Sequence, residues 1–104
     1  MEYQTGVKKK DTLEITELLN AKTGEAVKVN GAVHTIRDMG TVAFVILRKR
    51  EGLLQCVYEE GSATFDLKEI KEASTLEVEG VLEQNEKAPN GIEIRMKKVK
   101  ILSQ

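Results

Sequence analysis

The sequence predicts an all-β domain of five short strands, with one short helix between the third and fourth strands. Three observations support this prediction. Apolar and polar residues alternate with a period of two in several segments, which is the pattern of strands with one buried face. Clusters of glycine, asparagine and aspartate separate these segments. The interval 66–73 instead has apolar residues at helical spacing.

The composition is that of one domain with a small core. The chain has 104 residues, of which 40% are hydrophobic. Sixteen basic and 17 acidic residues give a net charge of −1, which argues against a protein that binds polyanions mainly through its total charge. A local basic patch is compatible with this balance. The single cysteine, Cys56, excludes an internal disulfide, and its apolar neighbours predict a buried thiol.

Residues 1–25 are expected to precede the barrel as an arm and a short helical turn, and residues 26–104 to form the barrel. The arm has no hydrophobic periodicity and ends in three lysines, which indicates a solvated segment. Asp11 or Thr12 is a candidate cap for the helical turn, which runs to Leu19.

Three strands follow this turn. In the first, from Ala26, three valines and a glycine face one side and polar residues face the other. An Asp-Met-Gly turn signal separates it from the second strand, Thr41–Arg48. The third strand is Leu53–Tyr58, and the intervening Lys49–Gly52 is expected to form a hairpin loop.

The remaining elements are a helix and two strands. Asp66, with Glu69 three residues later, predicts a capped helix start. The cleanly alternating segment Thr75–Gln84 predicts the fourth strand. In the fifth strand the apolar positions change parity after Met96, which requires a bulge or bend near Lys97.

This order of elements matches the oligonucleotide/oligosaccharide-binding (OB) barrel, which has five strands. Closing the sheet removes its edges, which suits a chain with a small core. A small SH3-like barrel is the structural alternative, but that fold lacks an equivalent helix between its third and fourth strands.

The second and third strands form the candidate binding face. If the alternate residues beginning at Ala43 face the core, then Phe44 and Arg48 face outward, as does Gln55 on the next strand. A loop centred on Lys49-Arg50 places Phe44 directly opposite Gln55. A ring beside an amide, with cations nearby, can stack on a base, read its edge and hold phosphates. A second interpretation, in which Phe44 belongs to the core, stays open because the run TVAFVIL is apolar throughout.

Two segments, VKVNGAVHTIRDMGTVAFVILRKREGLLQCV and ASTLEVEGVLEQNEKAPNGIEI, resemble the N-terminal anticodon-binding domain of aspartyl-tRNA synthetases, a class II group. The resemblance covers residues 27–102. Its most specific parts are residues 36–40, Phe44 and residues 47–55, and residues 87–93 are similar to the archaeal-type branch. The resemblance implies the OB barrel and binding of tRNA.

Four residues match family positions that contact the anticodon. By this resemblance, Phe44 stacks on the central anticodon uridine and Gln55 contacts base edges. Arg37 matches the arginine near the third anticodon base, and Glu93 matches an acidic residue that reads the first. The cations of the hairpin are expected to contact the RNA backbone: Arg48, Lys49 and Arg50.

The sequence departs from the family in two residues and in length. Ala32 occupies a position where many relatives have tryptophan, and Lys49 one where they usually have aspartate. The catalytic domain of the family is several times larger than this chain, and nothing in the sequence resembles it. We therefore expect an excised domain or a free-standing relative that has no aminoacylation activity of its own.

The expected function is non-catalytic recognition of the anticodon loop of aspartate tRNA, with asparagine tRNA as a second candidate. A protein-interaction module and a general binder of single-stranded nucleic acid are the alternatives. We expect no cofactor or metal, because His34 is the single histidine and no ligands cluster at metal spacing. The sequence lacks an apolar stretch of about 20 residues and an apolar signal region, so we expect a cytoplasmic protein without membrane contact. No long amphipathic helix is present, so we expect a monomer.

Overall fold

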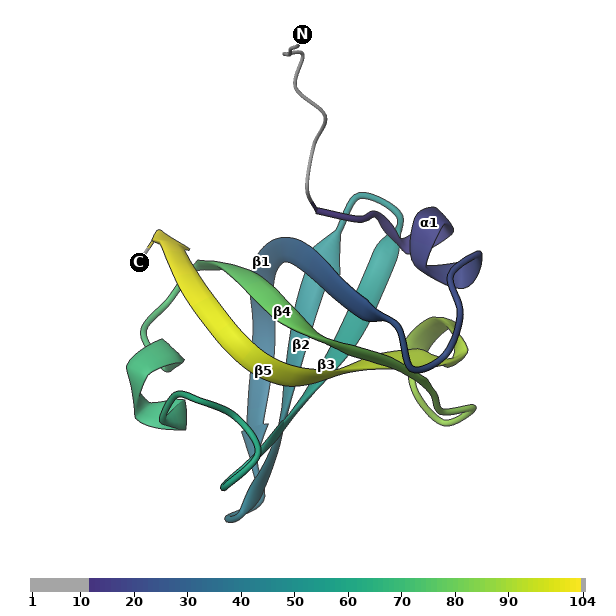
Figure 1. Ribbon diagram of the computed structural model, residues 1–104. Helices are drawn as coiled ribbons and strands as arrows, with labels where there is room; N and C mark the ends of the chain where they lie inside the picture. Colours follow the sequence, from purple (N-terminus) through teal and green to yellow (C-terminus); the bar gives the residue numbers. More distant parts are fainter. Residues whose placement is uncertain (1–11, 104) are drawn as a thin grey trace, which may run out of the picture.

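The computed structural model describes residues 12–103 (Figure 1). The three lysines of the predicted arm and the candidate cap Asp11 lie outside the described residues. The strands are β1 (Ala26–Asp38), β2 (Val42–Lys49), β3 (Gly52–Glu59), β4 (Thr75–Gln84) and β5 (Ile92–Ser103). The helices are α1 (Ile15–Leu19) and two 3₁₀ helices, η1 (Leu67–Ile70) and η2 (Pro89–Gly91).

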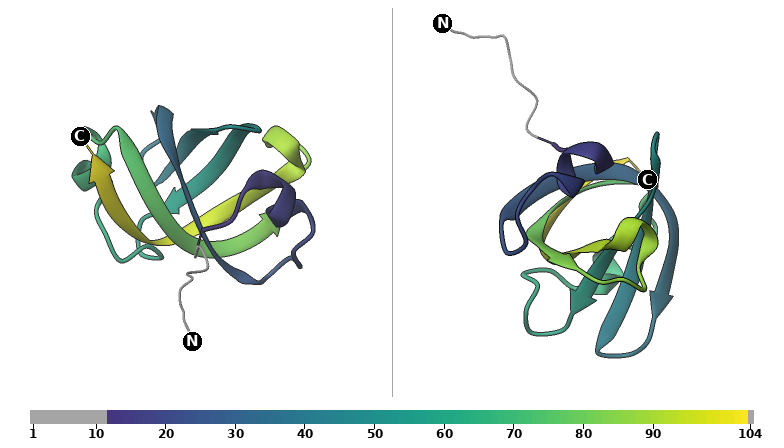
Figure 2. Two further views of the ribbon diagram at one scale, coloured as in Figure 1. Left: turned by 90° about the horizontal axis from the view of Figure 1, so that it is seen from above. Right: turned by 90° about the vertical axis from the view of Figure 1, so that its right-hand side faces the viewer.

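The five strands close into a barrel in the order β1-β2-β3-β5-β4. Neighbouring strands are antiparallel except for β3 and β5, which are parallel. The long strand β1 pairs with β4 through its first half and with β2 through its second half, so it bends around the barrel (Figures 1 and 2). This topology, with a helix between β3 and β4, is that of the OB barrel. The predicted fold is confirmed, and the SH3-like alternative is excluded.

The inward rows predicted from the period of two form the barrel core. Removing these aliphatic side chains from water stabilises the fold by about 1.5–3 kcal/mol for each fully buried side chain. The side chains of the core that have no exposed surface come from all five strands and η1: Val29, Ala43, Val45, Leu47, Leu54, Cys56, Ile70, Leu76, Val78, Ile94 and Met96.

The strand β5 changes its inward parity at a bulge beside Gly80. Glu79 pairs with Lys98 and Gly80 pairs with Met96, so Lys97 is the extra residue of the bulge. The predicted irregularity near Lys97 is confirmed. A Cβ atom on Gly80 would lie 2.1 Å from the carbonyl oxygen of Arg95, a distance that no side chain tolerates. Glycine therefore allows β4 and β5 to approach closely at this bend.

The predicted helix between the third and fourth strands is the single 3₁₀ turn η1. The Asp66 side chain accepts the N–H of Lys68 at 3.0 Å, and the Glu69 side chain accepts the N–H of Asp66 at 3.1 Å. The reciprocal Asp66–Glu69 cap is therefore present as predicted. Leu67 and Ile70 point into the core and fix this turn against the barrel.

The helix α1 packs on the barrel beside the β2–β3 turn (Figure 1). Its N-cap is Glu14, so the prediction that Asp11 or Thr12 caps the helix is wrong. The backbone N–H of Glu14 donates to Glu17 Oε1 at 2.8 Å. Leu18 is 1% exposed and belongs to the barrel core, so α1 is part of the same packed unit. Within residues 12–103, no helix has the length and apolar character needed to cross a membrane.

Candidate nucleic-acid interface

The β2–β3 hairpin has a two-residue turn. Lys49 pairs with Gly52, which leaves Arg50 and Glu51 as the turn. Gly52 has a φ of +138°, a conformation that favours glycine, as the predicted hairpin loop requires. The turn is centred one residue later than the Lys49-Arg50 centre expected from the sequence.

This shift changes the partner of Phe44 but not its face. Phe44 lies opposite Val57, and Gln55 lies opposite Ile46, so the predicted direct pairing of Phe44 with Gln55 is wrong. The two side chains remain on the outer face as diagonal neighbours, a relation in which Cα atoms are about 7–8 Å apart. That separation still lets a ring and an amide contact one ligand.

The outward direction of Phe44 follows from the burial of its neighbours. Ala43 and Val45 have no exposed surface on the inner row, whereas Phe44 is half-buried on the outer row. The interpretation that assigned Phe44 to the core is therefore wrong. Its ring forms part of a surface that a ligand can reach.

A groove of about 460 Å³ lies over this outer face. Apolar side chains form much of its surface, and none of the described residues that line it is acidic. An apolar surface with few polar groups can hold a planar ligand and fix its orientation. The lining residues come from β1, β2, β3, and the segment between β4 and β5: His34, Thr35, Arg37, Phe44, Ile46, Leu53, Gln55, Asn85, Lys87 and Pro89.

The amide of Gln55 is held in one orientation by Glu93. Gln55 Nε2 donates to Glu93 Oε1 at 3.0 Å, and Asn85 Nδ2 donates to the same oxygen at 2.9 Å. An ionised carboxylate only accepts hydrogen bonds, so the NH₂ group of Gln55 must face Glu93. The carbonyl oxygen of Gln55 is therefore the group that remains to accept a hydrogen bond from a ligand.

Of the predicted cations, Arg37 and Arg48 lie in or beside the groove, and Arg50 lies in the adjoining turn. Arg37 lines the groove on β1, opposite Phe44. Arg48 is exposed on the outer row opposite the groove residue Leu53, and Arg50 is exposed in the turn. Among residues 12–103, these arginines make no hydrogen bond or ion pair with one another or with other side chains. Their charges can therefore serve an anionic ligand.

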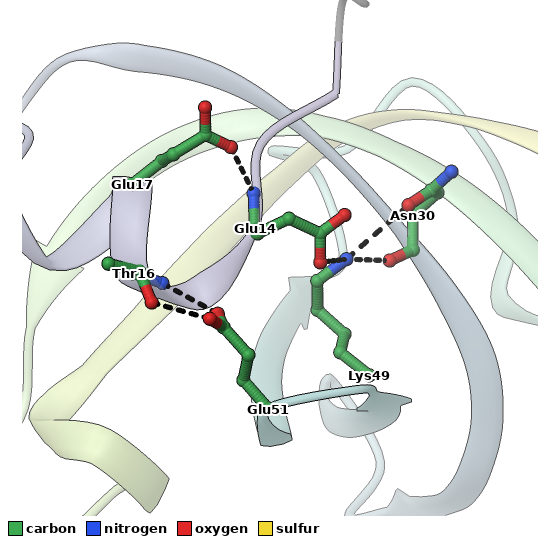
Figure 3. A network of polar contacts seen from close by, with 6 residues as sticks. All are labelled: Glu14, Thr16, Glu17, Asn30, Lys49 and Glu51. Atoms are coloured by element: carbon green, nitrogen blue, oxygen red, sulfur yellow. Dashed lines mark hydrogen bonds and ion pairs between the residues drawn. The ribbon is translucent and has the colours of Figure 1, made fainter.

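Lys49 occupies a different environment (Figure 3). Its side chain is 3% exposed, and Nζ lies 3.4 Å from Glu14 Oε1. Nζ also donates to the backbone oxygen of Asn30 and to Asn30 Oδ1, the latter at 3.3 Å. The phosphate contact expected of Lys49 does not fit this position, because protein groups surround the ammonium. Lys49 has the same parity as the inward residues Val45 and Leu47, a signal present in the sequence.

Sequence reasoning did not identify Asn85 as a site residue. Its Oδ1 accepts the N–H of Lys87 at 3.0 Å, which is ordinary turn chemistry, while its Nδ2 donates to Glu93. The sequence signal indicates only the turn. His34 enters the groove at an irregularity of β1, where the pairing with β2 shifts between Val33 and Thr35.

The groove contains no reactive thiol. Cys56 has no exposed surface, as predicted, and burial raises the pKa of its thiol to about 12. In the described part of the chain, no three His, Cys, Asp or Glu side chains form a group that could hold a metal ion. The groups that line the groove can stack on a ring, form hydrogen bonds and attract anions.

A closed OB barrel with an apolar, arginine-edged groove over β2 and β3 defines a domain of the nucleic-acid-binding class. Residues 27–102 match the tRNA anticodon family, described as an OB-fold nucleic acid binding domain. The chain belongs to this family.

Relatives and solved structures agree with this assignment. The aspartate–tRNA(Asp/Asn) ligase of Saccharolobus solfataricus is 39% identical over 86% of this chain, and the matched region is 21% of that protein. The crystal structure of asparaginyl-tRNA synthetase from Pyrococcus horikoshii has a TM-score of 0.71 and 26% identity, covering 78% of this chain and 20% of that one. OBody AM1L10, solved bound to hen egg-white lysozyme, has the same fold, with a TM-score of 0.73 and 24% identity over 95% of this chain and 100% of that one. The chain thus spans about a fifth of the length of the curated relatives that it matches.

Proposed function

We propose that this domain binds the anticodon loop of aspartate tRNA and has no catalytic activity of its own. The observation that supports this most strongly is the joint position of Phe44 and Gln55 in one groove edged by Arg37. The similarity to ligases named for tRNA(Asp/Asn) supports tRNA as the class of RNA. Asparagine tRNA is a second candidate ligand for the same reason.

The groove has the groups that single-stranded RNA recognition requires. The half-buried ring of Phe44 can stack on an unpaired base. Because the NH₂ group of Gln55 faces Glu93, its carbonyl oxygen can accept a hydrogen bond from a donor such as the N3–H of uracil. Arg37 and Arg48 can neutralise phosphates that flank the bound base.

The absence of catalysis is the second part of the proposal. The matched region is about a fifth of the ligases from Saccharolobus solfataricus and Thermus thermophilus, and in this chain it is the OB barrel. We expect no aspartate-dependent pyrophosphate exchange and no aminoacylation by the purified chain. Robust aspartate-dependent pyrophosphate exchange by the pure chain, reproduced in independent preparations, would contradict this part of the proposal.

The test of RNA binding is a titration of the chain with aspartate tRNA, an unrelated tRNA and a homopolymer at one fixed salt concentration. We expect the affinity to be highest for aspartate tRNA. Equal affinity for all three RNAs would identify a general single-strand binder, and binding to none would contradict the proposal. In that case protein binding becomes the better candidate, since OBody AM1L10 has this fold and was solved bound to lysozyme.

A further inference from the structure

The β2–β3 turn is anchored through Lys49 and Glu51, whose contacts Figure 3 shows and which flank Arg50 in the sequence. On one side, Glu51 Oε1 accepts the backbone N–H of Thr16 at 2.8 Å, and Glu51 Oε2 accepts the Thr16 hydroxyl at 2.5 Å. On the other side, the ammonium of Lys49 contacts Asn30 of β1 and Glu14, the N-cap of α1. We call this set of contacts the turn anchor. It joins three parts of the chain that are distant in sequence.

The turn anchor involves charged groups with well-defined partners. The hydroxyl of Thr16, followed by its backbone N–H, lowers the pKa of the Glu51 carboxyl, which is the effect of donors on an ionised carboxylate. The Lys49 side chain reaches its partners with 3% of its surface exposed. Hydrogen bonds of this kind, with an ionised partner, are shorter and stronger than neutral ones.

The backbone of β1 lies close enough to the hairpin for this contact. A Cβ atom on Gly31 would lie 3.1 Å from the carbonyl oxygen of Arg48 and 3.3 Å from Cγ of Lys49. The glycine therefore leaves space beside β1 for the Lys49 side chain, whose Nζ reaches Asn30.

The consequence concerns the two arginines next to the anchored residues. Lys49 and Glu51 are both held, so the intervening Arg50 is presented from a fixed turn. Arg48 is the residue before Lys49, and it lies on the outer row opposite the groove residue Leu53. A side chain presented by a fixed backbone loses less freedom when it binds than one on a mobile loop.

We propose that Lys49 and Glu51 are positioning residues for RNA binding, which hold the turn that carries Arg50 and the adjoining end of β2, where Arg48 lies opposite the groove residue Leu53. The helix α1 then supports RNA binding through the turn, although none of its residues lines the groove. This inference rests on the proposed function. It differs from a purely structural role because it requires loss of affinity in a protein that remains folded.

Glu51→Gln is the first test variant. It removes a negative charge next to the proposed RNA path, so a simple charge effect would strengthen binding. Glutamine can still accept the Thr16 N–H but lacks the charge that strengthens both hydrogen bonds, so a weakened turn anchor would instead reduce binding by about two- to tenfold, the usual effect of freeing one interface side chain. Thr16→Val removes the hydroxyl donor without changing the charge, and it should weaken binding in the same direction. Both are measured against aspartate tRNA, well below the melting temperature.

Glu86→Gln is the matched control. Glu86 is exposed between the groove residues Asn85 and Lys87, and within residues 12–103 its side chain makes no hydrogen bond or ion pair with the turn. This variant makes the same change of charge near the groove but leaves the turn anchor intact. Its affinity for aspartate tRNA should equal or exceed that of the parent chain.

Arg50→Met gives the readout that a purely structural role would not change. If the turn anchor acts through this arginine, Glu51→Gln should lower the affinity less in the Arg50→Met background than in the parent chain. The slope of log affinity against log salt should also fall in Glu51→Gln, because phosphate contacts are lost.

The outcomes separate this inference from the proposed function. Suppose that the parent chain binds aspartate tRNA, and that folded Glu51→Gln and Thr16→Val variants bind it equally well with the same salt slope. That result overturns this inference but leaves the proposed function standing. Additive effects of Glu51→Gln and Arg50→Met on affinity also overturn it. A folded parent chain that binds none of the RNAs overturns the proposed function and this inference with it.

Discussion

Replacement of Phe44 by alanine should weaken RNA binding much more than it destabilises the fold. The ring is half-buried on the outer face, lines the groove and lies outside the core cluster. Loss of one base–aromatic stack costs about 1–3 kcal/mol, which corresponds to an increase in Kd of about 5- to 150-fold. Truncation of a phenylalanine in a core costs about 3–5 kcal/mol of folding stability. Because Phe44 is not in the core, we expect a loss of stability below about 1.5 kcal/mol.

Phe65→Ala is the matched control for this variant. Phe65 packs against the core, and its ring centroid lies 5.3 Å from that of Tyr58. Its removal forfeits this aromatic contact and the packing beneath it, so the loss of stability should exceed that of Phe44→Ala. Phe65 does not line the groove, so its affinity for RNA should be unchanged once the protein is folded.

The assay combines thermal melting with fluorescence anisotropy of a labelled anticodon stem-loop at fixed salt. A loss of 1 kcal/mol lowers the melting temperature of a domain of this size by about 4–8 °C, so the two variants are separable. A Phe44→Ala chain that binds RNA normally, or that is largely unfolded, would refute the assignment of the groove. Weak RNA binding by a well-folded Phe65→Ala chain would contradict the assignment of Phe44 to RNA binding and of Phe65 to stability.

Three further predictions concern other parts of the molecule. Gln55→Ala should relax discrimination at one anticodon base while leaving non-cognate affinity nearly unchanged, which competition with base-substituted stem-loops will measure; uniform loss against all loops would contradict the role of its carbonyl oxygen. Gly80→Ala should lower the free energy of unfolding by at least about 1–3 kcal/mol in urea titrations, because its Cβ would lie 2.1 Å from a backbone oxygen; a chain of unchanged stability would show that β4 and β5 can separate at no cost. Burial raises the pKa of the Cys56 thiol to about 12, so Cys56 should resist a thiol reagent at pH 8 until denaturant is added. The free energy of unfolding should also decline as the pH rises from about 9, because the thiol ionises there in the unfolded chain but not in the folded one. Fast labelling of the native chain would contradict this.

Local patterns in the sequence were sufficient to predict the elements of the fold. The fourth strand has the predicted bounds Thr75–Gln84, the Asp66–Glu69 cap is present, and the bulge lies at Lys97. Each of these features depends on residues within a few positions of one another, so the local sequence specifies it.

The features that the sequence did not predict depend on distant contacts or on the geometry of one turn. The residues KREG permit more than one turn, so period-two parity gave the outer face of Phe44 but not its partner Val57. The contact between Thr16 and Glu51 joins positions 35 residues apart, and neither segment has a local signal for it. The buried ammonium of Lys49 was missed because a lysine next to a turn is usually solvated.

The central claim is that the groove reads the anticodon, and one comparison tests it most directly. The affinity of the chain is measured for the anticodon stem-loop of aspartate tRNA and for the same stem-loop with an abasic site at the central anticodon position. Both RNAs have the same backbone charge, so the comparison isolates the stacked base. We expect the abasic loop to bind about 5- to 150-fold more weakly, and Phe44→Ala to bind both loops with the same low affinity. Equal affinity of the parent chain for the two loops would contradict the claim.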